Sequence, residues 1–272
     1  MHPIILDLGI WKMMSFTIHP RIYGYGLMLA LGVLVALFAM NRLVQTSREF
    51  TLEDLIDVAI IAVFSGVIGS RLFYVVFYDW AYFAANPLQI INPQVQGLVF
   101  YGGFLFGALG VSAWAWRKGK NPWKLADIVA PGLMLAYGIG RIGCFLNGCC
   151  YGKPTEVGWG LLFPTADIFY RHPTQLYESA AAVLLFVILC RLYVKRTFDG
   201  QVLWAYVLLY AVERFSVEFL RENLVVWHGL TIAQVTAMIM ALIAIPAYYW
   251  LRNRSDQAAR FAAAEHEKEG CE

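Results

Sequence analysis

Two arginines, Arg141 and Arg214, stand in segments that are otherwise apolar enough to lie in a bilayer. A guanidinium buried in a membrane helix costs about 2.5 to 3.5 kcal/mol on the insertion scale, so such residues usually line a polar site. The guanidinium donates paired hydrogen bonds that match the oxygens of a phosphate group. The two arginines therefore predict a site for an anionic group within a membrane domain.

Arg141 lies within Gly138-Ile-Gly-Arg-Ile-Gly143, which matches the letters of the dinucleotide fingerprint G-x-G-x-x-G. The fingerprint requires a preceding β-strand, whereas an apolar membrane span precedes these residues, so nucleotide binding is rejected. The glycines either permit close helix packing in lipid or expose backbone N–H groups to a ligand. Beside Arg141, Gly140 is predicted to contact the bound anion.

Arg214 belongs to a second polar pattern, which runs from Tyr210 to Arg221. At helical spacing Tyr210, Arg214 and Glu218 share one face in steps of four, and Arg221 follows seven residues after Arg214. The pattern indicates either an anion site or a structural ion pair between Arg214 and Glu218 that faces the interior. Glu213 is expected to point elsewhere, near the membrane edge.

A third polar cluster, Arg171-His-Pro-Thr-Gln-Leu-Tyr-Glu178, stands where an external loop enters the next span. Pro173 suits the first turn of a helix, and His172, Gln175 and Glu178 then line up in steps of three. We expect His172 to be either a hydrogen-bonded structural residue or a catalytic one at the outer mouth of the bundle. Gln175 is expected to contact the substrate.

Five cysteines are present: Cys144, Cys149, Cys150, Cys190 and Cys271. Zinc sites usually have paired C-x2-C spacings or histidines at short range, which these cysteines do not supply, so no metal is predicted. Cys149 and Cys150 are expected near the outer face. The favoured interpretation is small packing residues, with a disulfide to Cys144 as the alternative and a reactive role as a third.

The elements that must position these residues are membrane helices. Hydrophobic residues make up 60% of the chain and charged residues 15%, with a mean hydropathy of +0.58, whereas soluble domains are about 45–50% apolar and about 25% charged. A net charge of +2 gives no argument for nucleic acid. The 272 residues predict an all-α integral membrane protein with about seven spans. We expect the spans near Ile22–Met40, Leu55–Tyr78, Leu98–Trp116, Leu125–Leu146, Pro173–Val194, Val202–Leu220 and Leu230–Leu251.

Basic residues orient the spans, because they fall on alternate connections that the positive-inside rule places in the cytoplasm. They are Arg42 and Arg48; Arg117, Lys118, Lys120 and Lys124; Arg191, Lys195 and Arg196; and Arg252, Arg254, Arg260 and Lys268. The rule predicts an N-terminus outside and a cytoplasmic tail over residues 252–272, in a single membrane domain covering 1–272. External loops near 79–97 and 149–171 are expected to form a small cap. Residues 1–16 do not look like a cleavable signal peptide, so the first span is expected to direct insertion.

With these patterns together, the chain resembles the bacterial prolipoprotein diacylglyceryl transferases over nearly all of its length. The resemblance rests on Tyr25-Gly-Leu-Met28, Gly69-Ser-Arg-Leu-Phe-Tyr74, Tyr101-Gly-Gly103, Gly140-Arg-Ile-Gly-Cys-Phe-Leu-Asn-Gly148, Arg171 to Glu178 and Tyr210 to Arg221. It implies a multi-pass inner-membrane enzyme that moves the diacylglyceryl group of phosphatidylglycerol to the lipobox cysteine thiol of a preprolipoprotein signal peptide. The product is a thioether, glycerol phosphate leaves, and the implied partners are these substrates and membrane lipids, with no cofactor, metal or nucleic acid.

The resemblance also assigns roles to residues. Arg141 and Arg214 match the essential arginines of the family, and a further set matches positions thought to shape the lipid site: Tyr25, Asn147, Gly152, Tyr210 and Glu218. Tyr101 stands where many members have the histidine of a His-Gly-Gly motif, a proposed base, and Gly102 and Gly103 complete that motif as substrate-binding residues. Many members have Asn in place of Cys144 and Glu in place of Cys149.

The implied reaction needs a positive field at the departing phosphate, which the arginines would supply. It also needs help for the thiol, since only about 3% of an ordinary thiol is ionised at pH 7. Tyr101, His172 and Glu218 are the candidate bases. The alternatives are a phospholipid-binding or lipid-transporting membrane paralogue without transferase activity. A transporter should show repeated halves, and the sequence has none.

Overall fold

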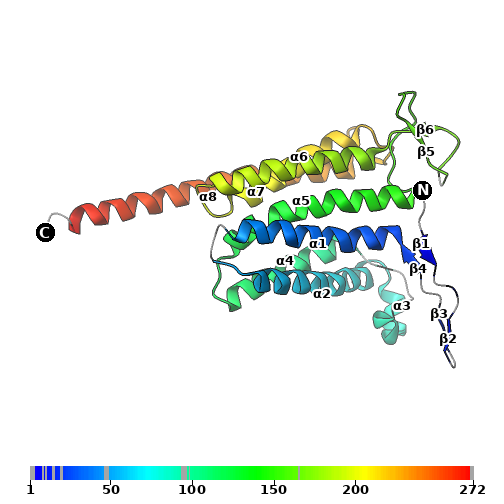
Figure 1. Ribbon diagram of the computed structural model, residues 1–272, viewed down its shortest axis with the longest axis horizontal. Coiled ribbons are helices and arrows are strands. Elements are labelled where there is room, and N and C mark those ends of the chain that lie inside the picture. Colours follow the sequence, from blue (N-terminus) through cyan, green and yellow to red (C-terminus); the bar gives the residue numbers. More distant parts are fainter. Residues whose placement is uncertain are drawn as a thin grey trace. The chain divides into compact units, whose positions relative to one another are not determined.

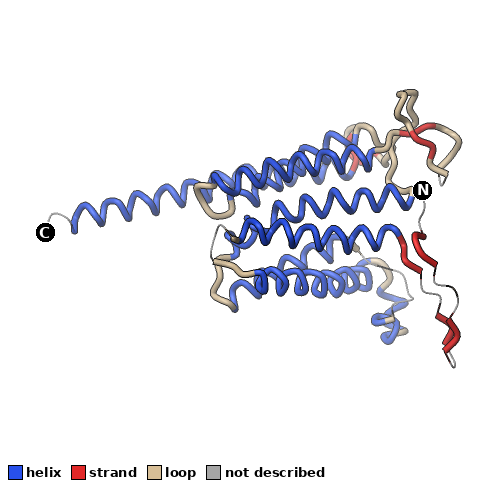
Figure 2. The backbone as a smooth tube through the Cα atoms, viewed as in Figure 1, coloured by secondary structure: helices blue, strands red, loops and turns tan. Residues whose placement is uncertain are grey.

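A computed structural model describes residues 4–7, 9, 11–13, 16–18, 21–45, 49–92, 97, 99–164 and 166–269. Arg48, Cys271, Leu98 at the start of the third expected span and part of the expected loop 79–97 lie outside these residues. Helices dominate the described chain, and short strands occur near helix ends and in loops (Figure 2). The chain divides into two compact units: unit 1 comprises Met1–Leu43 and Ala126–Glu272, and unit 2 comprises Val44–Leu125.

Unit 1 contains most of the helices and all four strand pairs that the described residues form. The helices are α1 (Gly24–Val44), α5 (Pro122–Asn147), α6 (Thr174–Lys195), α7 (Gln201–Glu218) and α8 (Ile232–Glu269), of which α1 and α5 reach across the unit boundary. The antiparallel pairs are β1 (Ile4–Asp7) with β4 (Arg21–Tyr23), β2 (Trp11–Met13) with β3 (Phe16–Ile18), β5 (Leu161–Leu162) with β6 (Tyr170–Arg171), and β7 (Val225–Trp227) with β8 (Leu230–Thr231).

Small residues bring the helices of unit 1 close together. A Cβ atom on Gly32 of α1 would lie 3.2 Å from the backbone oxygen of Ala136 in α5, and one on Gly138 of α5 would lie 2.9 Å from the Cβ of Ala182 in α6. Helix α7 lies beside both α6 and α8, and α8 continues past the ends of the other two (Figure 1). Close approach through small residues is the usual way membrane helices associate.

Asp127 of α5 holds the beginning of α7. Its side chain is fully buried and accepts hydrogen bonds of 2.9 Å from each of the backbone N–H groups of Gly200, Val202 and Leu203. The first N–H groups of a helix have no partner within the helix, and a carboxylate there also interacts favourably with the helix dipole. This contact fixes α7, which carries Arg214, to α5, which carries Arg141.

Unit 2 contains α2 (Leu52–Phe77), α3 (Trp80–Ala85), the 3₁₀ helix η1 (Pro87–Ile91) and α4 (Phe100–Arg117). A capping box between Thr51 and Asp54 begins α2, and Asp54 also forms an ion pair with Lys120, just after α4. The guanidinium of Arg71 in α2 donates to the backbone oxygens of Gln89 and Ile90, each at 2.8 Å. The described part of the expected external loop 79–97 is therefore folded and tied to α2.

The exposed faces of these helices are apolar, which is the pattern of a membrane protein. Five helices of the described chain are long and apolar enough to cross a membrane: α1, α2, α5, α6 and the segment Ile232–Ala258 of α8. Large apolar side chains such as Leu34, Phe64, Leu184 and Leu242 are 61–69% exposed, while several carboxylates are buried. The all-α membrane fold is confirmed. Helices α4 and α7 coincide with the other two expected spans, and the count of seven and the orientation stay predictions.

Candidate functional site

Glu178 is the centre of a charged cluster inside unit 1. It lies one turn into α6, its side chain is fully buried, and its oxygens approach three arginines. The distances are 3.1 Å to Nε of Arg141, 3.8 Å to Nη1 of Arg214 and 3.7 Å to Nη1 of Arg221. The three guanidinium groups come from α5, from α7 and from the turn after α7, so one carboxylate joins the two arginine segments.

A second carboxylate, Glu218, completes the cluster at the end of α7. Its Oε2 lies 2.9 Å from Nη2 of Arg214, and its Oε1 accepts a 2.7 Å hydrogen bond from Asn223. The spacing of four residues indicated this pair as one of two alternatives, and the structure confirms that Arg214 and Glu218 share one face. Glu218 is 2% exposed, so the pair faces the interior.

Aromatic side chains border the cluster on the side of α5 and α7. The guanidinium of Arg141 lies 5.0 Å from the ring centre of Tyr137, which in turn meets the ring of Tyr210 edge to face at 5.4 Å. The hydroxyl of Tyr137 donates to Glu213 at 3.4 Å, and Glu213 is buried. The expectation that Glu213 points away toward the membrane edge is wrong, because its buried side chain contacts Tyr137 of α5.

Several N–H groups of the three arginines make no hydrogen bond within the described protein. Among the described residues, buried nitrogens of Arg141, Arg214 and Arg221 approach carboxylate oxygens without hydrogen-bond geometry. The three arginines also outnumber the two carboxylates, Glu178 and Glu218, that pair with them. Buried donors of this kind are rare in native proteins and call for an explanation. An anionic group with several oxygens would satisfy both the geometry and the excess positive charge.

The glycines beside Arg141 lie within α5, toward its C-terminal end, and not in a loop. Gly138 packs against Ala182 of α6, and a Cβ atom on Gly143 would lie 3.0 Å from the Cβ of Met28 in α1. Since N–H groups inside an α-helix bond to carbonyls one turn earlier, the expectation that these glycines expose N–H groups to a ligand is wrong. The rejection of a nucleotide fingerprint is confirmed. A Cβ atom on Gly140 would lie 3.8 Å from the Leu29 side chain in α1, and contact of Gly140 with substrate stays a prediction.

Tyr25 stands over the same end of α5. It belongs to the first turn of α1, is 42% exposed, and its ring would lie 3.3 Å from a Cβ atom on Gly143. Tyr25 therefore sits next to the helical turn that follows Arg141. This location suits a residue at the edge of the arginine cluster, as the resemblance implies, and its role stays a prediction.

The loop after α5 returns to the start of α6 and is fixed there by backbone contacts. The Gly152 N–H donates to the His172 carbonyl at 2.8 Å, and a Cβ atom on Gly152 would lie 2.5 Å from the Leu220 backbone oxygen. Gln175 is fully buried and donates to the Cys149 carbonyl at 2.5 Å. Gly152 and Gln175 thus hold the loop next to the cluster, and direct contact with substrate stays a prediction.

His172 is hydrogen-bonded but is not on the helical face that the spacing predicted. Helix α6 begins at Thr174 with Pro173 as its N-cap residue, so His172 lies outside the helix and the expected line of His172, Gln175 and Glu178 is broken. His172 Nδ1 lies 3.2 Å from the hydroxyl of Tyr177. The structural alternative is supported by this bond, and a catalytic role stays a prediction.

Arg171 next to His172 is a structural hub of the loop. It forms ion pairs with Asp167 at 2.5 Å and with Glu222 at 3.2 Å, and it donates to the Gly152 carbonyl at 3.1 Å. The hydrogen bond from Arg171 lowers the pKa of Asp167. This network ties the loop between α5 and α6 to the turn after α7, where Arg221 enters the cluster.

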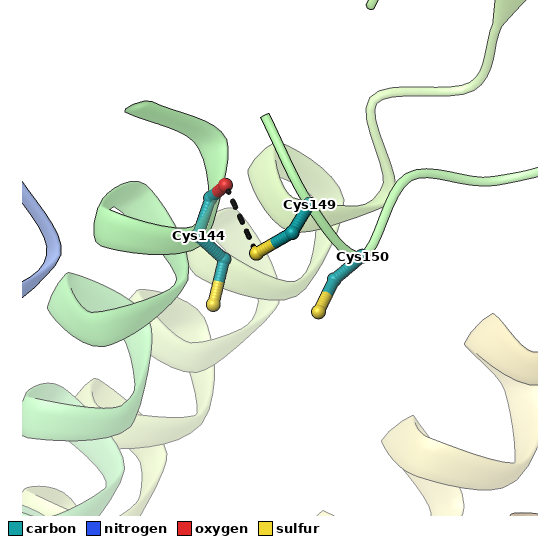
Figure 3. Close-up of side chains that lie close together, drawn as sticks. All are labelled: Cys144, Cys149 and Cys150. Carbon is teal, nitrogen blue, oxygen red and sulfur yellow. Dashed lines mark hydrogen bonds between the residues drawn. The ribbon is translucent and has the colours of Figure 1, made fainter. Parts of the chain in front are cut away.

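Three cysteines meet at the end of α5 (Figure 3). The sulfurs of Cys144, Cys149 and Cys150 lie within 4.8 Å of one another, and the described cysteines are free thiols. Asn147, the exposed last residue of α5, directs its Nδ2 at the Cys149 sulfur at 3.6 Å. Burial raises the pKa of Cys149, while a hydrogen bond from Cys144 and the charges of the nearby arginines lower the pKa of Cys150. The three sulfurs therefore converge in the fold although their spacing along the chain is not that of a zinc site, and the absence of a metal stays a prediction.

Tyr101, Gly102 and Gly103 belong to unit 2, at the start of α4, whereas the arginine cluster belongs to unit 1. Tyr101 is 56% exposed. A Cβ atom on Gly102 would collide with the backbone of Gly69 in α2, and one on Gly103 would collide with Ser70. Close packing of α4 on α2 accounts for the two glycines. The parts of Tyr101, Gly102 and Gly103 in the reaction stay predictions.

Sequence reasoning noticed Glu178 and Arg221 but assigned them no role, and it passed over Tyr137. A usable signal existed for Glu178, because a carboxylate inside an apolar helix needs a cationic partner. The cations available to it were Arg141 and Arg214, which also stand in apolar segments. Tyr137 had no such signal, since it is one of 15 tyrosines and becomes special only through its contact with Arg141.

The fold and the cluster define a multi-pass membrane protein with a buried group of arginines and carboxylates. Comparison with known proteins identifies the family: a profile described as prolipoprotein diacylglyceryl transferase matches residues 13–250. The chain belongs to this family. It is accordingly an enzyme of the transferase class, which confirms the resemblance drawn from the sequence motifs.

Named relatives agree with this assignment. A protein of Clostridium tetani is 37% identical over 207 residues, covering 75% of this chain and 82% of the relative. One of Oleidesulfovibrio alaskensis is 39% identical over 215 residues, with coverage of 76% and 79%. One of Pseudomonas savastanoi is 38% identical over 259 residues, with coverage of 90% and 94%. All three carry the name phosphatidylglycerol–prolipoprotein diacylglyceryl transferase.

Proposed function

We propose that this chain transfers the diacylglyceryl group of phosphatidylglycerol to the thiol of the lipobox cysteine in a preprolipoprotein. The thiol sulfur attacks the glyceryl carbon that carries the phosphate, and a carbon–sulfur bond forms while the carbon–oxygen bond breaks. The bonding electrons leave with the phosphate oxygen as glycerol phosphate, and the thiol proton passes to a base. Family membership supports the reaction. The arginine cluster around Glu178 is the observation that supports placing the lipid phosphate there.

In this proposal Arg141 and Arg214 bind the phosphate of the lipid. Negative charge grows on the departing phosphate oxygens during the reaction, and donors positioned in advance stabilise that charge without reorganising. Arg221 reaches the same carboxylate and belongs to the same group of donors. Glu178 holds the three guanidinium groups together before the lipid arrives, which would lower the cost of arranging like charges side by side.

The other predicted residues shape the site around this centre. Tyr210 lies against Tyr137, and Glu218 orients Arg214 through their ion pair. Gly152 and Gln175 act as positioning residues, because they fix the loop that follows α5. Tyr25, Gly140 and Asn147 lie on the last turns of α5 or against them and are proposed to contact the lipid.

The base is proposed to be Tyr101 or His172. Glu218 is a weaker candidate, since Arg214 and Asn223 already engage both of its carboxylate oxygens. His172 holds its Nδ1 near the Tyr177 hydroxyl, which fixes the ring. Tyr101 is exposed at the start of α4 and occupies the position of the family's proposed histidine base.

We place the enzyme in the bacterial inner membrane with seven spans, the N-terminus outside and the C-terminus in the cytoplasm. The basic residues on alternate connections support this orientation. The loop over residues 149–171 and the α3–η1 segment would then lie on the outer side, where a preprolipoprotein emerges with its lipobox cysteine. The arginine cluster, at the same end of α5 and α6 as that loop, would face the outer half of the bilayer.

One experiment tests the proposal. The purified chain is placed in vesicles of phosphatidylglycerol with a peptide that contains a lipobox cysteine. The peptide should gain the mass of one diacylglyceryl group, and one glycerol phosphate should appear for each modified peptide. A peptide with serine in place of cysteine, and vesicles of phosphatidylcholine with no phosphatidylglycerol, should give neither signal.

The same assay separates the alternatives. A lipid-binding paralogue would retain phosphatidylglycerol through the arginines but leave the peptide unmodified. A lipid transporter would move labelled phosphatidylglycerol between leaflets without release of glycerol phosphate. Either result, obtained with a folded and inserted protein, would overturn the proposed transfer.

A further inference from the structure

The three thiols at the end of α5 form a cluster that the transfer reaction does not use, because the acceptor thiol belongs to the substrate. Cys144 lies in the last turn of α5, and Cys149 and Cys150 follow the helix end (Figure 3). Their sulfurs lie within 4.8 Å of one another. Two thiolates bound at about 2.3 Å to one tetrahedral ion are about 3.8 Å apart, so small side-chain rotations would bring the three sulfurs to metal-binding distance.

The backbone turns sharply to achieve this convergence. Gly148 has φ = 70° and Cys150 has φ = 64°, a left-handed conformation that is uncommon for a residue other than glycine. A non-glycine residue is held there only when surrounding contacts fix it. Here Thr174 donates to the Cys150 carbonyl at 2.9 Å and Gln175 to the Cys149 carbonyl at 2.5 Å. Two buried side chains of α6 thus fix the turn that aims the cysteines at one point.

We propose that Cys144, Cys149 and Cys150 bind one thiophilic metal ion, Zn²⁺ or Cu⁺, as three thiolates. Thiolate ligands favour these ions over Mg²⁺ or Ca²⁺. Binding displaces the thiol protons to solvent, so a Zn²⁺ complex carries one net negative charge and a Cu⁺ complex two. Zn²⁺ would complete its four ligands with a water molecule, whereas three thiolates alone suit Cu⁺.

The surroundings favour the bound form. Arg141 lies one turn before Cys144 in α5, and Arg141 and Arg221 are close enough to Cys150 for their charges to act on it. A negatively charged complex therefore has cations beside it. Asn147 already directs an N–H group at the Cys149 sulfur and would keep that hydrogen bond to a thiolate. Hydrogen bonds to the ligand atoms orient them and strengthen binding.

A disulfide is the competing use of the same thiols, but it joins two sulfurs and leaves the third without a function. A metal site, unlike a disulfide, explains why all three sulfurs converge. The proposal is independent of the proposed transfer, because a metal-binding measurement on the purified chain does not depend on activity.

The test uses the purified, reduced full-length chain in detergent, freed of metal and then equilibrated with Zn²⁺ alone, Cu⁺ alone or Co²⁺ as a spectroscopic probe. We expect one Zn²⁺ or one Cu⁺ per chain, and a sulfur-to-cobalt charge-transfer band. Replacing Cys144, Cys149 and Cys150 together with serine should abolish both. Cys149→Ser alone should weaken binding by roughly 10-fold or more, since even changes beyond the ligands cost 10- to 100-fold.

The matched control is Cys190→Ser, because Cys190 lies in α6 outside the cluster and its loss should leave binding unchanged. If the triple variant fails to fold, the proposal can still be tested on the wild-type chain by thiol alkylation. Bound metal should protect the three clustered thiols from alkylation, as mapped by mass spectrometry, and leave labelling of Cys190 unchanged. Wild-type protein that binds neither ion, shows no protection, or forms a disulfide among the three thiols even after reduction would overturn the proposal.

Discussion

The carboxylate of Glu178 in α6 lies 3.1 Å from Nε of Arg141 in α5. The same fully buried carboxylate also approaches Arg214 and Arg221, so a single negative charge gathers three positive ones. Burying a carboxylate without partners would be very costly, and burying three guanidinium groups without one would be costlier still. Glu178 therefore allows three guanidinium groups to lie close together inside the protein.

Glu178→Gln should reduce transfer because it removes this charge while keeping the shape of the side chain. The three guanidinium groups would repel one another and shift, and a displacement of about 1 Å at a reacting centre can cost roughly 10²-fold in rate. The melting temperature in detergent should also fall, since breaking a buried ion pair leaves charges without compensation. Transfer kinetics and thermal unfolding of the purified variant measure both effects.

The matched control for Glu178→Gln is Glu222→Gln. Glu222 also pairs with an arginine, Arg171, but its side chain is 66% exposed, so its loss should change rate and melting temperature little. A positioning role for Glu178 predicts a lower kcat together with a changed KM for phosphatidylglycerol. Normal kinetics in a variant that merely melts earlier would reduce Glu178 to a stabilising residue.

Arg141→Ala and Arg214→Ala should each abolish most transfer while leaving the protein folded and inserted. Removal of a donor that stabilises developing charge typically costs 10²- to 10³-fold in rate. Lysine at either position should restore little, because an ammonium group lacks the paired donors of a guanidinium. Arg191→Ala is the control, since Arg191 is an exposed arginine of α6 away from the cluster. Turnover near wild type in either cluster variant would remove the anion-binding interpretation.

Hydropathy and charge spacing predicted the parts of this site that lie within one helix. Each of the seven expected spans overlaps a helix of the described chain, and Arg214 and Glu218, four residues apart, form an ion pair. The periodic patterns succeeded because burial and helical geometry act locally. The same reasoning failed at His172, because Pro173 ends up as the N-cap of α6 and places His172 outside the helix.

Contacts between segments could not be read from the sequence. The approach of Glu178 to Arg141 depends on how α5 packs against α6, which the small residues Gly138 and Ala182 control at the level of atoms. The meeting of Cys144 with Cys149 and Cys150 depends on left-handed backbone at Gly148 and Cys150. A rare conformation at a cysteine has no sequence signal of the kind that glycine gives.

Asp127→Ala should destabilise the protein without touching the reacting groups. It removes the acceptor for three backbone N–H groups at the start of α7, and an unsatisfied buried donor costs about 1 to 3 kcal/mol. The melting temperature should fall clearly. It should fall less in Asp127→Asn, because the amide oxygen can still accept hydrogen bonds from these N–H groups. Asp256→Ala, at an exposed position of α8, should leave the melting temperature unchanged. Equal stability of Asp127→Ala and wild type would mean that the cap contributes nothing measurable.

Gly152→Ala should disturb the loop that borders the arginine cluster. The added Cβ atom would stand 2.5 Å from the Leu220 backbone oxygen and 2.8 Å from the Thr174 side chain, so the loop must shift. Overpacking of this kind typically costs about 1 to 3 kcal/mol. The control is Gly158→Ala in the same loop, where a Cβ atom meets nothing within 4 Å. The melting temperature of Gly152→Ala should be lower than that of Gly158→Ala. Equal melting temperatures would show that the loop accommodates the added Cβ atom without cost.

The base can be identified by comparing Tyr101→Phe, Tyr101→His and His172→Gln across pH 6 to 9. A tyrosine hydroxyl has an ordinary pKa near 10, so it acts as a base at neutral pH only where nearby cations lower that pKa. If Tyr101 accepts the thiol proton, phenylalanine should lower the rate by roughly 10²-fold or more, the lower end of general-base contributions. Histidine should restore part of the rate with an optimum at lower pH, because its pKa is nearer 6.5.

The opposite outcome assigns the base to His172. In that case Tyr101→Phe keeps nearly normal turnover, and His172→Gln loses it. Tyr177→Phe gives a further check, because it removes the hydroxyl 3.2 Å from His172 Nδ1 while leaving both Tyr101 and the imidazole in place. A shifted pH optimum in Tyr177→Phe, measured as kcat/KM for the lipobox peptide, would show that this hydroxyl tunes the base. An unchanged profile in all four variants would exclude both residues.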